Sequence, residues 1–212
     1  MLSCAVVIPS YNEAANVARV VGVARAAALG PVLVVDDGSS DATAQVARYA
    51  GAEVISLAPN RGKGGAVVAG AAHLSAEVVV LLDADLLGLT PQHVWALAEP
   101  VLAGTEMTRG VFSGGRWRTT AAQRLTPQLN GQRGVLRARL LEVEGLAGSR
   151  YGIEVAITEH AKRCRWQVTD VPLAGVSHVM KEEKRGFWVG SGVRLKMYAE
   201  ILLELFRGWV RR

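Results

Sequence analysis

The sequence predicts a doubly wound α/β fold, in which a mainly parallel sheet is flanked by helices. Four short apolar runs alternate with alanine-rich stretches in the first half of the chain, and this alternation is typical of strands joined by helices in one sheet. The runs at 5–8, 32–35 and 78–82 are apolar at every position, which indicates strands covered on both faces.

The elements of the first half are expected in a regular order. We expect strands at 5–8, 32–35, 53–57 and 78–82, and helices at 16–29, 42–50 and 90–103. A further helix follows the glycine-rich segment 61–65 and runs to Leu74. Pro9 is expected to end the first strand, and Gly30 with Pro31 to stop the first helix. Asp41 is placed to cap the second helix.

The pattern changes in the second half. Segment 109–139 is rich in Gly, Arg, Thr and Gln and has few apolar runs, so we interpret it as a binding segment or loop rather than core. A helix is expected at 153–163, a strand at 166–171 and a terminal helix from 193 to 212. Since no linker divides the chain, we expect one domain over 1–212.

Composition limits the function classes. The chain has 212 residues, a formal net charge of +5 and 50% hydrophobic residues, which excludes a mainly disordered chain. Its two cysteines exclude a disulfide scaffold. No apolar run approaches the roughly 20 residues that span a bilayer, and no secretory signal is visible, so we expect a cytoplasmic protein. The basic balance fits phosphates, a nucleotide or an anionic membrane surface, or serves solubility alone.

Two carboxylates follow the fourth apolar run, in the triplet Asp83-Ala84-Asp85. In parallel sheets, ligands bind at the carboxyl ends of the strands. Carboxylates there suit Mg²⁺ or Mn²⁺, which also bind phosphate oxygens. The alternative is a solvated turn with an aspartate cap.

Two further polar segments follow strands. Asp36 and Asp37, before Gly38, offer acceptors to a base N–H, although turn chemistry explains the same residues. The segment 61–65 opens a helix with a lysine and exposed backbone N–H groups, which suit a diphosphate. It matches neither the P-loop nor the dinucleotide-binding glycine pattern, so a flexible loop remains an alternative.

Three segments together resemble the family 2-type glycosyltransferases with a GT-A fold. They are 6–13 (VVIPSYNE), 35–41 (VDDGSSD) and 83–85 (DAD). The resemblance implies a nucleotide-sugar donor, with UDP as the expected nucleotide, and a divalent metal, Mg²⁺ or Mn²⁺. It implies that Asp83 lies near the ribose or sugar and that Asp85 binds the metal and acts in catalysis. The residues implied around the nucleoside are Pro9, Tyr11, Glu13 and Asp37.

The second half is similar to a narrower group, the glucosyl-3-phosphoglycerate synthases. The similar segments are 62–64 (GKG), 151–155 (YGIEV) and 176–178 (VSH). This similarity implies that Lys63 contacts the donor, that Glu154 lies near the donor sugar and that His178 completes the metal site. Lys63 and Glu154 are thereby catalytic candidates. The segment 130–134 (NGQRG) departs from that group's pattern, so the acceptor stays open.

Positive charge concentrates in the irregular segment, which holds Arg109, Arg116, Arg118, Arg124 and Arg133. Arginine pairs well with phosphates and carboxylates, so we name Arg116 and Arg133 as acceptor-binding candidates, beside the alternative of a solvated basic loop. No nucleic-acid motif is present. The terminal helix combines aromatic and basic residues suited to a membrane interface, but packing on the core or in a homodimer explains its apolar stripe better.

These observations predict a metal-dependent glycosyltransferase with a nucleotide-sugar-binding half at 1–105, an acceptor-binding half at 106–190 and a terminal helix at 191–212. The expected transfer is of glucose from UDP-glucose to a small anionic acceptor such as 3-phosphoglycerate. The alternative acceptor is a polyprenyl phosphate or other lipid at a membrane surface. Stereochemistry stays open. Two alternatives of other classes are a sugar nucleotidyltransferase and a non-catalytic scaffold subunit.

Overall fold

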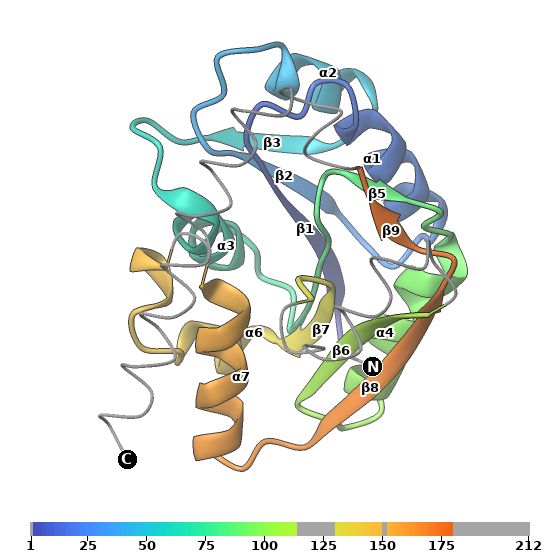
Figure 1. Cartoon of the computed structure of the whole chain (residues 1–212), viewed down its shortest axis with the longest axis vertical. Coiled ribbons are helices and arrows are strands. Elements are labelled where there is room, and N and C mark those ends of the chain that lie inside the picture. Colours follow the sequence, from blue (N-terminus) through green and yellow to red (C-terminus); the bar gives the residue numbers. More distant parts are fainter. Residues whose placement is uncertain (1, 114–129, 150–151, 180–212) are drawn as a thin grey trace.

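A seven-stranded sheet with helices on both faces forms the centre of the protein (Figure 1). The computed structural model describes residues 2–113, 130–149 and 152–179. The strand order is β3-β2-β1-β4-β7-β6-β8. Only β7 runs antiparallel to its two neighbours, and the other neighbouring pairs are parallel. The predicted fold class is therefore confirmed, while the expected terminal helix lies outside the described residues.

The strands and helices predicted for the first half are all confirmed. They are β1 (Cys4–Ser10), α1 (Val17–Ala26), β2 (Val32–Asp36), α2 (Thr43–Tyr49), β3 (Glu53–Ser56), α3 (Gly62–His73), β4 (Val78–Leu81) and α4 (Pro91–Leu102). Their boundaries differ from the expected ones by one to three residues, and β1 continues through Pro9 to Ser10, although Pro9 was expected to end it. β4 pairs with β1 only as far as Val7, whereas β2 pairs with it to Ser10. Asp41 accepts from the backbone N–H of Thr43 at the start of α2.

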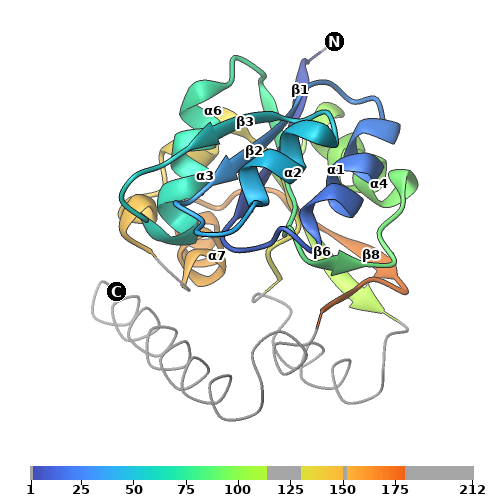
Figure 2. The same cartoon turned by 90° about the horizontal axis from the view of Figure 1, so that it is seen from above.

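The sheet separates two apolar layers, because successive side chains of a strand point to opposite faces. On one face, Val6 and Ile8 of β1 pack with buried residues of α1 and α4. On the other face, Ala5 and Val7 pack with buried residues of α3, α6 (Arg137–Leu141) and α7 (Ile153–Arg163). Figure 2 shows the two helix layers on either side of the strands.

The interpretation of segment 109–139 as a loop is wrong for both of its ends. β6 (Met107–Ser113) and β7 (Arg133–Leu136) are strands of the central sheet. Polar residues in these strands interrupt the apolar pattern by which a strand is predicted. Inside the protein such residues have hydrogen-bond partners: the buried Thr108 hydroxyl donates to the carbonyl of Leu97 at 2.6 Å. Residues 114–129, and Arg116 with them, lie outside the described part of the chain.

The last described elements bring the end of the second half back to the first. Helix α7 spans the predicted residues, and β8 (Val168–Ala174) begins and ends later than predicted. A second, two-stranded sheet pairs β5 (Leu86–Leu87) with β9 (Ser177–His178) in antiparallel fashion, with Leu86 opposite His178. His178 thereby reaches the Asp83-Ala84-Asp85 segment. None of the helices in the described part of the chain is long and apolar enough to cross a membrane.

Candidate functional site

Asp83 is the centre of a polar cluster at the carboxyl edge of the sheet. Asp83 follows the end of β4 after one intervening residue, Leu82. Asp83 Oδ1 lies 2.7 Å from the ammonium of Lys63. Asp83 Oδ2 lies 3.0 Å from Nε2 of His178 and accepts from the side-chain amide of Gln132 at 2.9 Å. Four segments far apart in the sequence therefore meet at one carboxylate.

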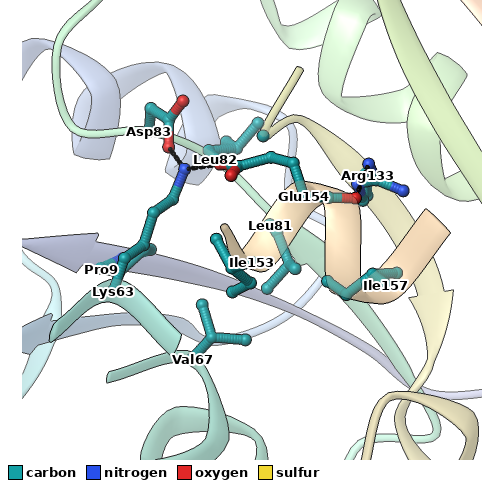
Figure 3. A pocket seen from close by; sticks show the side chains of 11 residues that line it. Pro9, Lys63, Val67, Leu81, Leu82, Asp83, Arg133, Ile153, Glu154 and Ile157 are labelled. Carbon is teal, nitrogen blue, oxygen red and sulfur yellow. Dashed lines mark hydrogen bonds and ion pairs between the residues drawn. The ribbon is translucent and has the colours of Figure 1, made fainter. Parts of the chain in front are cut away.

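Lys63 lies between two carboxylates (Figure 3). Besides Asp83, its ammonium contacts Oε1 of Glu154 at 2.5 Å. Lys63 is in the first turn of α3, and that turn packs closely on the 3-10 helix η2 (Leu146–Gly148). Gly64 donates its N–H to the carbonyl of Ser149 at 2.9 Å, and a Cβ there would collide with that carbonyl. The glycine-rich sequence thus positions Lys63 by permitting close packing.

The charges in this cluster stabilise one another. Burial disfavours the ammonium of Lys63, but the charges of Asp83 and Glu154 outweigh burial and raise the pKa of Lys63 well above its ordinary value. Burial likewise disfavours the carboxylate of Asp83, but Lys63 and His178 hold the pKa of Asp83 far below its usual range. Lys63 is therefore a permanent cation and Asp83 a permanent anion near neutral pH.

Glu154 occupies the first turn of α7, where an acidic side chain interacts favourably with the helix dipole. Arg133 of β7 contacts the same helix. Its guanidinium donates to the carbonyl of Glu154 and to the hydroxyl of Thr158, both at 3.0 Å. Arg133 is only 1% exposed, yet it lines the same small pocket as Lys63 and Asp83. Its predicted role in acceptor binding stays a prediction.

His178 lies on β9 of the small sheet, and Asp85 directly precedes the partner strand β5. The N–H of Val179 donates to the carbonyl of Asp85 at 3.1 Å. Burial would lower the pKa of His178, but its hydrogen bond with Asp83 and the charges of Asp83 and Asp85 raise it. Among the described residues, no three His, Cys, Asp or Glu side chains gather as a metal cluster.

The loops after β1 and β2 are tied together at the same edge of the sheet. The N–H of Asn12 donates to the Ser39 hydroxyl, and the side-chain oxygen of Asn12 accepts from the N–H of Ser40, both at 2.9 Å. Asn12 has a φ of 54°, a conformation that asparagine tolerates better than most residues. The N–H of Glu13 donates to the Thr43 hydroxyl at 2.8 Å.

The residues predicted around a nucleoside lie in or beside these loops. Asp37 is buried, and its carboxylate accepts from the N–H of Arg61 at 2.7 Å. Tyr11 is 47% exposed, so its ring is available to a flat ligand. Pro9 lines the pocket beside Lys63. The structure thus brings Pro9, Tyr11, Glu13 and Asp37 to one edge, while their binding role stays a prediction.

Comparison with known proteins identifies the family. The model of the glycosyl transferase family 2 matches residues 5–149 of this chain. The chain belongs to the glycosyl transferase family 2. The match includes β1 to β4, the triplet with Asp83 and Asp85, Lys63, and the strand with Arg133.

Curated relatives of this glycosyltransferase chain match it over a shorter stretch. An undecaprenyl-phosphate 4-deoxy-4-formamido-L-arabinose transferase of Salmonella paratyphi A is 38% identical over 92 residues, which cover 38% of this chain and 28% of that protein. Glycosyltransferase AglJ of Haloferax volcanii is 41% identical over 81 residues, or 38% of this chain and 26% of that protein. The matches thus span well under half of either relative.

Solved structures share the fold over nearly the whole family 2 chain. A glucosyl-3-phosphoglycerate synthase from Mycobacterium tuberculosis, in complex with Mn²⁺, UDP and glucosyl-3-phosphoglycerate, superposes with a TM-score of 0.76 at 23% identity. The superposition covers 98% of this chain and 80% of that one. The same synthase with Mn²⁺, UDP-glucose and phosphoglyceric acid gives a TM-score of 0.74, at 23% identity, over 98% and 79% of the two chains. The GT-A fold implied by the sequence is thereby confirmed.

Sequence reasoning assigned no role to one residue of this family 2 site. Gln132 lies in the segment 130–134, which departs from the pattern of the glucosyl-3-phosphoglycerate synthases. Its side chain contacts Asp83 and is fully buried. The interpretation of segment 109–139 as a loop gives no indication that this side chain is buried.

Proposed function

We propose that this protein transfers a sugar from a UDP-sugar, with a divalent metal, to an acceptor that carries a phosphate group. The observation that carries the proposal is the partly buried ammonium of Lys63, held between the carboxylates of Asp83 and Glu154 at the carboxyl edge of a GT-A fold. Membership of family 2 favours a glycosyltransferase over the nucleotidyltransferase and scaffold alternatives.

Lys63 supplies charge stabilisation in this proposal. Breaking the bond between sugar and diphosphate develops negative charge on the leaving phosphate. A preorganised cation stabilises that charge strongly in a water-poor site. The raised pKa of Lys63 keeps it charged near neutral pH. Its Asp83 and Glu154 contacts hold the ammonium at the edge where the diphosphate would bind.

Asp85 and His178 are the residues that would hold the metal. Asp83, Asp85 and Glu154 place three carboxylates at this edge, and a divalent metal would offset their repulsion of a diphosphate. Carboxylate and imidazole suit Mn²⁺ or Mg²⁺, and such ions often take only one or two protein ligands beside phosphate oxygens. When bound, the metal would neutralise the diphosphate.

The role of Glu154 in this proposal depends on whether the transfer inverts or retains the anomeric configuration. An inverting transferase needs a carboxylate that takes a proton from the acceptor hydroxyl, and Glu154 is the candidate in the second half. A retaining transferase needs no such base, and Glu154 would then orient the donor sugar. The anomeric configuration of the product, read by NMR, separates the two courses.

Two acceptors are supported by different observations. The synthase with the similar fold was crystallised with phosphoglyceric acid, which favours a small anionic acceptor such as 3-phosphoglycerate. The Salmonella relative is named as a transferase to undecaprenyl phosphate, which favours a lipid phosphate at a membrane surface. Both carry a phosphate, and in both cases a basic chain favours binding.

The test is release of UDP from UDP-glucose with Mn²⁺ or Mg²⁺, without acceptor, with 3-phosphoglycerate and with a short polyprenyl phosphate in detergent. Acceptor-dependent release with 3-phosphoglycerate supports the first acceptor. Release only with the lipid phosphate supports the second. If UDP does not bind at all in the presence of metal, as measured by calorimetry, the proposed donor is wrong.

A further inference from the structure

Arg133 is a charged side chain that lies inside the protein. It extends from β7, where it pairs in register with Leu81 of β4, and it is 1% exposed. Burial lowers the pKa of Arg133 to about 10, so the guanidinium still carries its charge near neutral pH. A buried charge costs free energy, and apolar residues of similar volume often stabilise a core equally well. Stability alone therefore does not explain an arginine at this position.

The guanidinium of Arg133 binds one turn of helix α7. Its Nη2 donates to the backbone carbonyl of Glu154 and to the Thr158 hydroxyl, both at 3.0 Å. The Thr158 hydroxyl in turn donates to the same carbonyl at 2.7 Å, and Thr158 is 5% exposed. These three hydrogen bonds form a closed triangle, shielded from water, that joins β7 to the first turn of α7.

Glu154 has its backbone in this triangle and its side chain in the polar cluster. Its carboxylate contacts Lys63 Nζ at 2.5 Å, and Figure 3 shows Glu154 between Lys63 and Arg133. The direction of a side chain follows from the helix backbone that carries it. A shift of this turn would therefore move the carboxylate of Glu154 relative to Lys63.

We infer that Arg133 is a positioning residue, which holds the first turn of α7 so that the carboxylate of Glu154 stays against Lys63. This inference rests on the proposed function and deepens it, because Glu154 and Lys63 are the residues assigned there to the donor sugar and its diphosphate. Arg133 then contributes to turnover without touching either substrate. Misplacing a reacting group by about 1 Å can cost about a hundredfold in rate.

Direct binding of an acceptor phosphate is the competing role for Arg133. The side chain lines the pocket beside Lys63, but it is 1% exposed, and its Nη2 already donates to two protein oxygens. A phosphate would have to displace these oxygens or reach the other N–H groups of an enclosed side chain. A residue that acts through the backbone of its neighbour needs no exposure, so the burial of Arg133 favours positioning.

Thr158→Val tests this role without changing Arg133 or Glu154. Valine conserves the branched shape and removes the hydroxyl, so the guanidinium and the Glu154 carbonyl each lose one partner. UDP release from UDP-glucose is measured with Mn²⁺ and either 3-phosphoglycerate or a short polyprenyl phosphate. We expect kcat to fall by about tenfold, the size of one hydrogen bond, with the KM for the acceptor unchanged.

Arg133→Lys gives a second measurement of the same kind. Lysine keeps the charge and loses the planar fork of donors that reaches both oxygens. We expect the same split, with a lower kcat and an unchanged acceptor KM. A normal kcat with a raised acceptor KM would overturn the inference in favour of acceptor binding.

The dependence on Glu154 is tested by combining substitutions. In a Glu154→Gln background, Thr158→Val should cause no further loss of kcat, since effects that pass through one residue do not add. An equal fold-loss in both backgrounds would overturn the inference, because a general loss of stability adds to the effect of Glu154→Gln. Where Glu154→Gln turns over too slowly to measure, the split between kcat and KM decides.

Two controls separate positioning from folding. Thr169 is an exposed residue of β8, so Thr169→Val reports the same substitution away from the site and should leave kcat unchanged. Thr158→Ser keeps the hydroxyl and should recover the turnover that Thr158→Val loses; a serine variant as slow as the valine variant contradicts the role of the hydroxyl. If the unaltered protein binds no UDP in calorimetry with Mn²⁺, the proposed function is wrong, and this inference falls with it.

Discussion

Strands β1, β2 and β4 are apolar at almost every position, whereas β6, β7 and β8 carry arginine, glycine, threonine and aspartate within the same sheet. The first group lies between two helix layers, so both of its faces need apolar side chains. The second group pairs its polar residues across strands: Arg109 of β6 makes two hydrogen bonds of 2.8 Å with Asp170 of β8.

The two groups of strands contribute differently to the candidate site. The apolar strands end in the loops that carry Asp37, Asp83 and Asp85, so hydrophobicity reveals them. The second half supplies Gln132 and His178, which contact Asp83, and Glu154, which contacts Lys63. The first half therefore carries the motifs that resemble the family, whereas in the proposed function the second half supplies the residues expected to distinguish one donor or acceptor from another.

The largest expected effect is a loss of turnover on substitution of Asp85, in the Asp83-Ala84-Asp85 triplet of the first half. Asp85→Asn conserves shape and removes the charge that would hold a metal, so kcat for UDP release should fall by about 10³-fold, the scale of losing a main electrostatic group. The melting temperature should stay unchanged, because the substitution leaves the packing of β4 and β5 intact. A variant with normal turnover would show that the metal assignment is wrong.

The next effect is on stability and lies in β7. A Cβ at Gly134 would collide with the carbonyl of Leu97 and lie 2.7 Å from the Thr108 hydroxyl, which accepts from the Gly134 N–H. Gly134→Ala should therefore lower the free energy of unfolding by about 3 kcal/mol, as measured by urea denaturation. An unchanged midpoint would mean that the polar strands tolerate repacking that the structure does not allow.

A smaller effect is expected on the pH dependence of Mn²⁺ binding. Asp83 and Asp85 raise the pKa of His178 against the effect of its burial, and only neutral imidazole binds a metal. As pH falls below that raised pKa, protons compete with Mn²⁺, so Mn²⁺ affinity measured with UDP should fall by about tenfold per pH unit. The His178→Asn variant should bind more weakly and with a flatter pH dependence. A profile as steep as that of the unaltered protein would exclude His178 as a ligand.

The smallest effect lies on the surface of the first half. Gly22 is in the middle of α1, and nothing lies within 4 Å of a Cβ built there. Gly22→Ala should raise the free energy of unfolding by about 0.5–1 kcal/mol, since glycine loses more backbone freedom in a helix than alanine. Paired with Gly134→Ala, it shows that the two glycines differ by their surroundings. A loss of stability at Gly22 would contradict this.

The sequence predicts the fold further than it predicts the site. Strands such as Val78–Leu81 reveal themselves because each side chain is apolar. β7 stayed hidden because Arg133 is read as a surface residue, although two hydrogen bonds to α7 compensate its burial. The sequence pattern and the family resemblance both point to Lys63 and Asp83 as site residues, but that they contact each other follows from packing alone. The contact of Gln132 with Asp83 could not be predicted because it joins residues 49 positions apart.

The cluster around Asp83 also sets when this protein becomes competent during folding. Its contacts join residues separated by 91 positions, for Lys63 and Glu154, and by 95, for Asp83 and His178. Closing such long loops has an entropic cost that local elements do not bear, and contacts of this kind tend to form late. A chain that has already assembled the β1 to β4 sheet would still lack these contacts, so we expect ligand binding to report a late step of folding rather than collapse of the core.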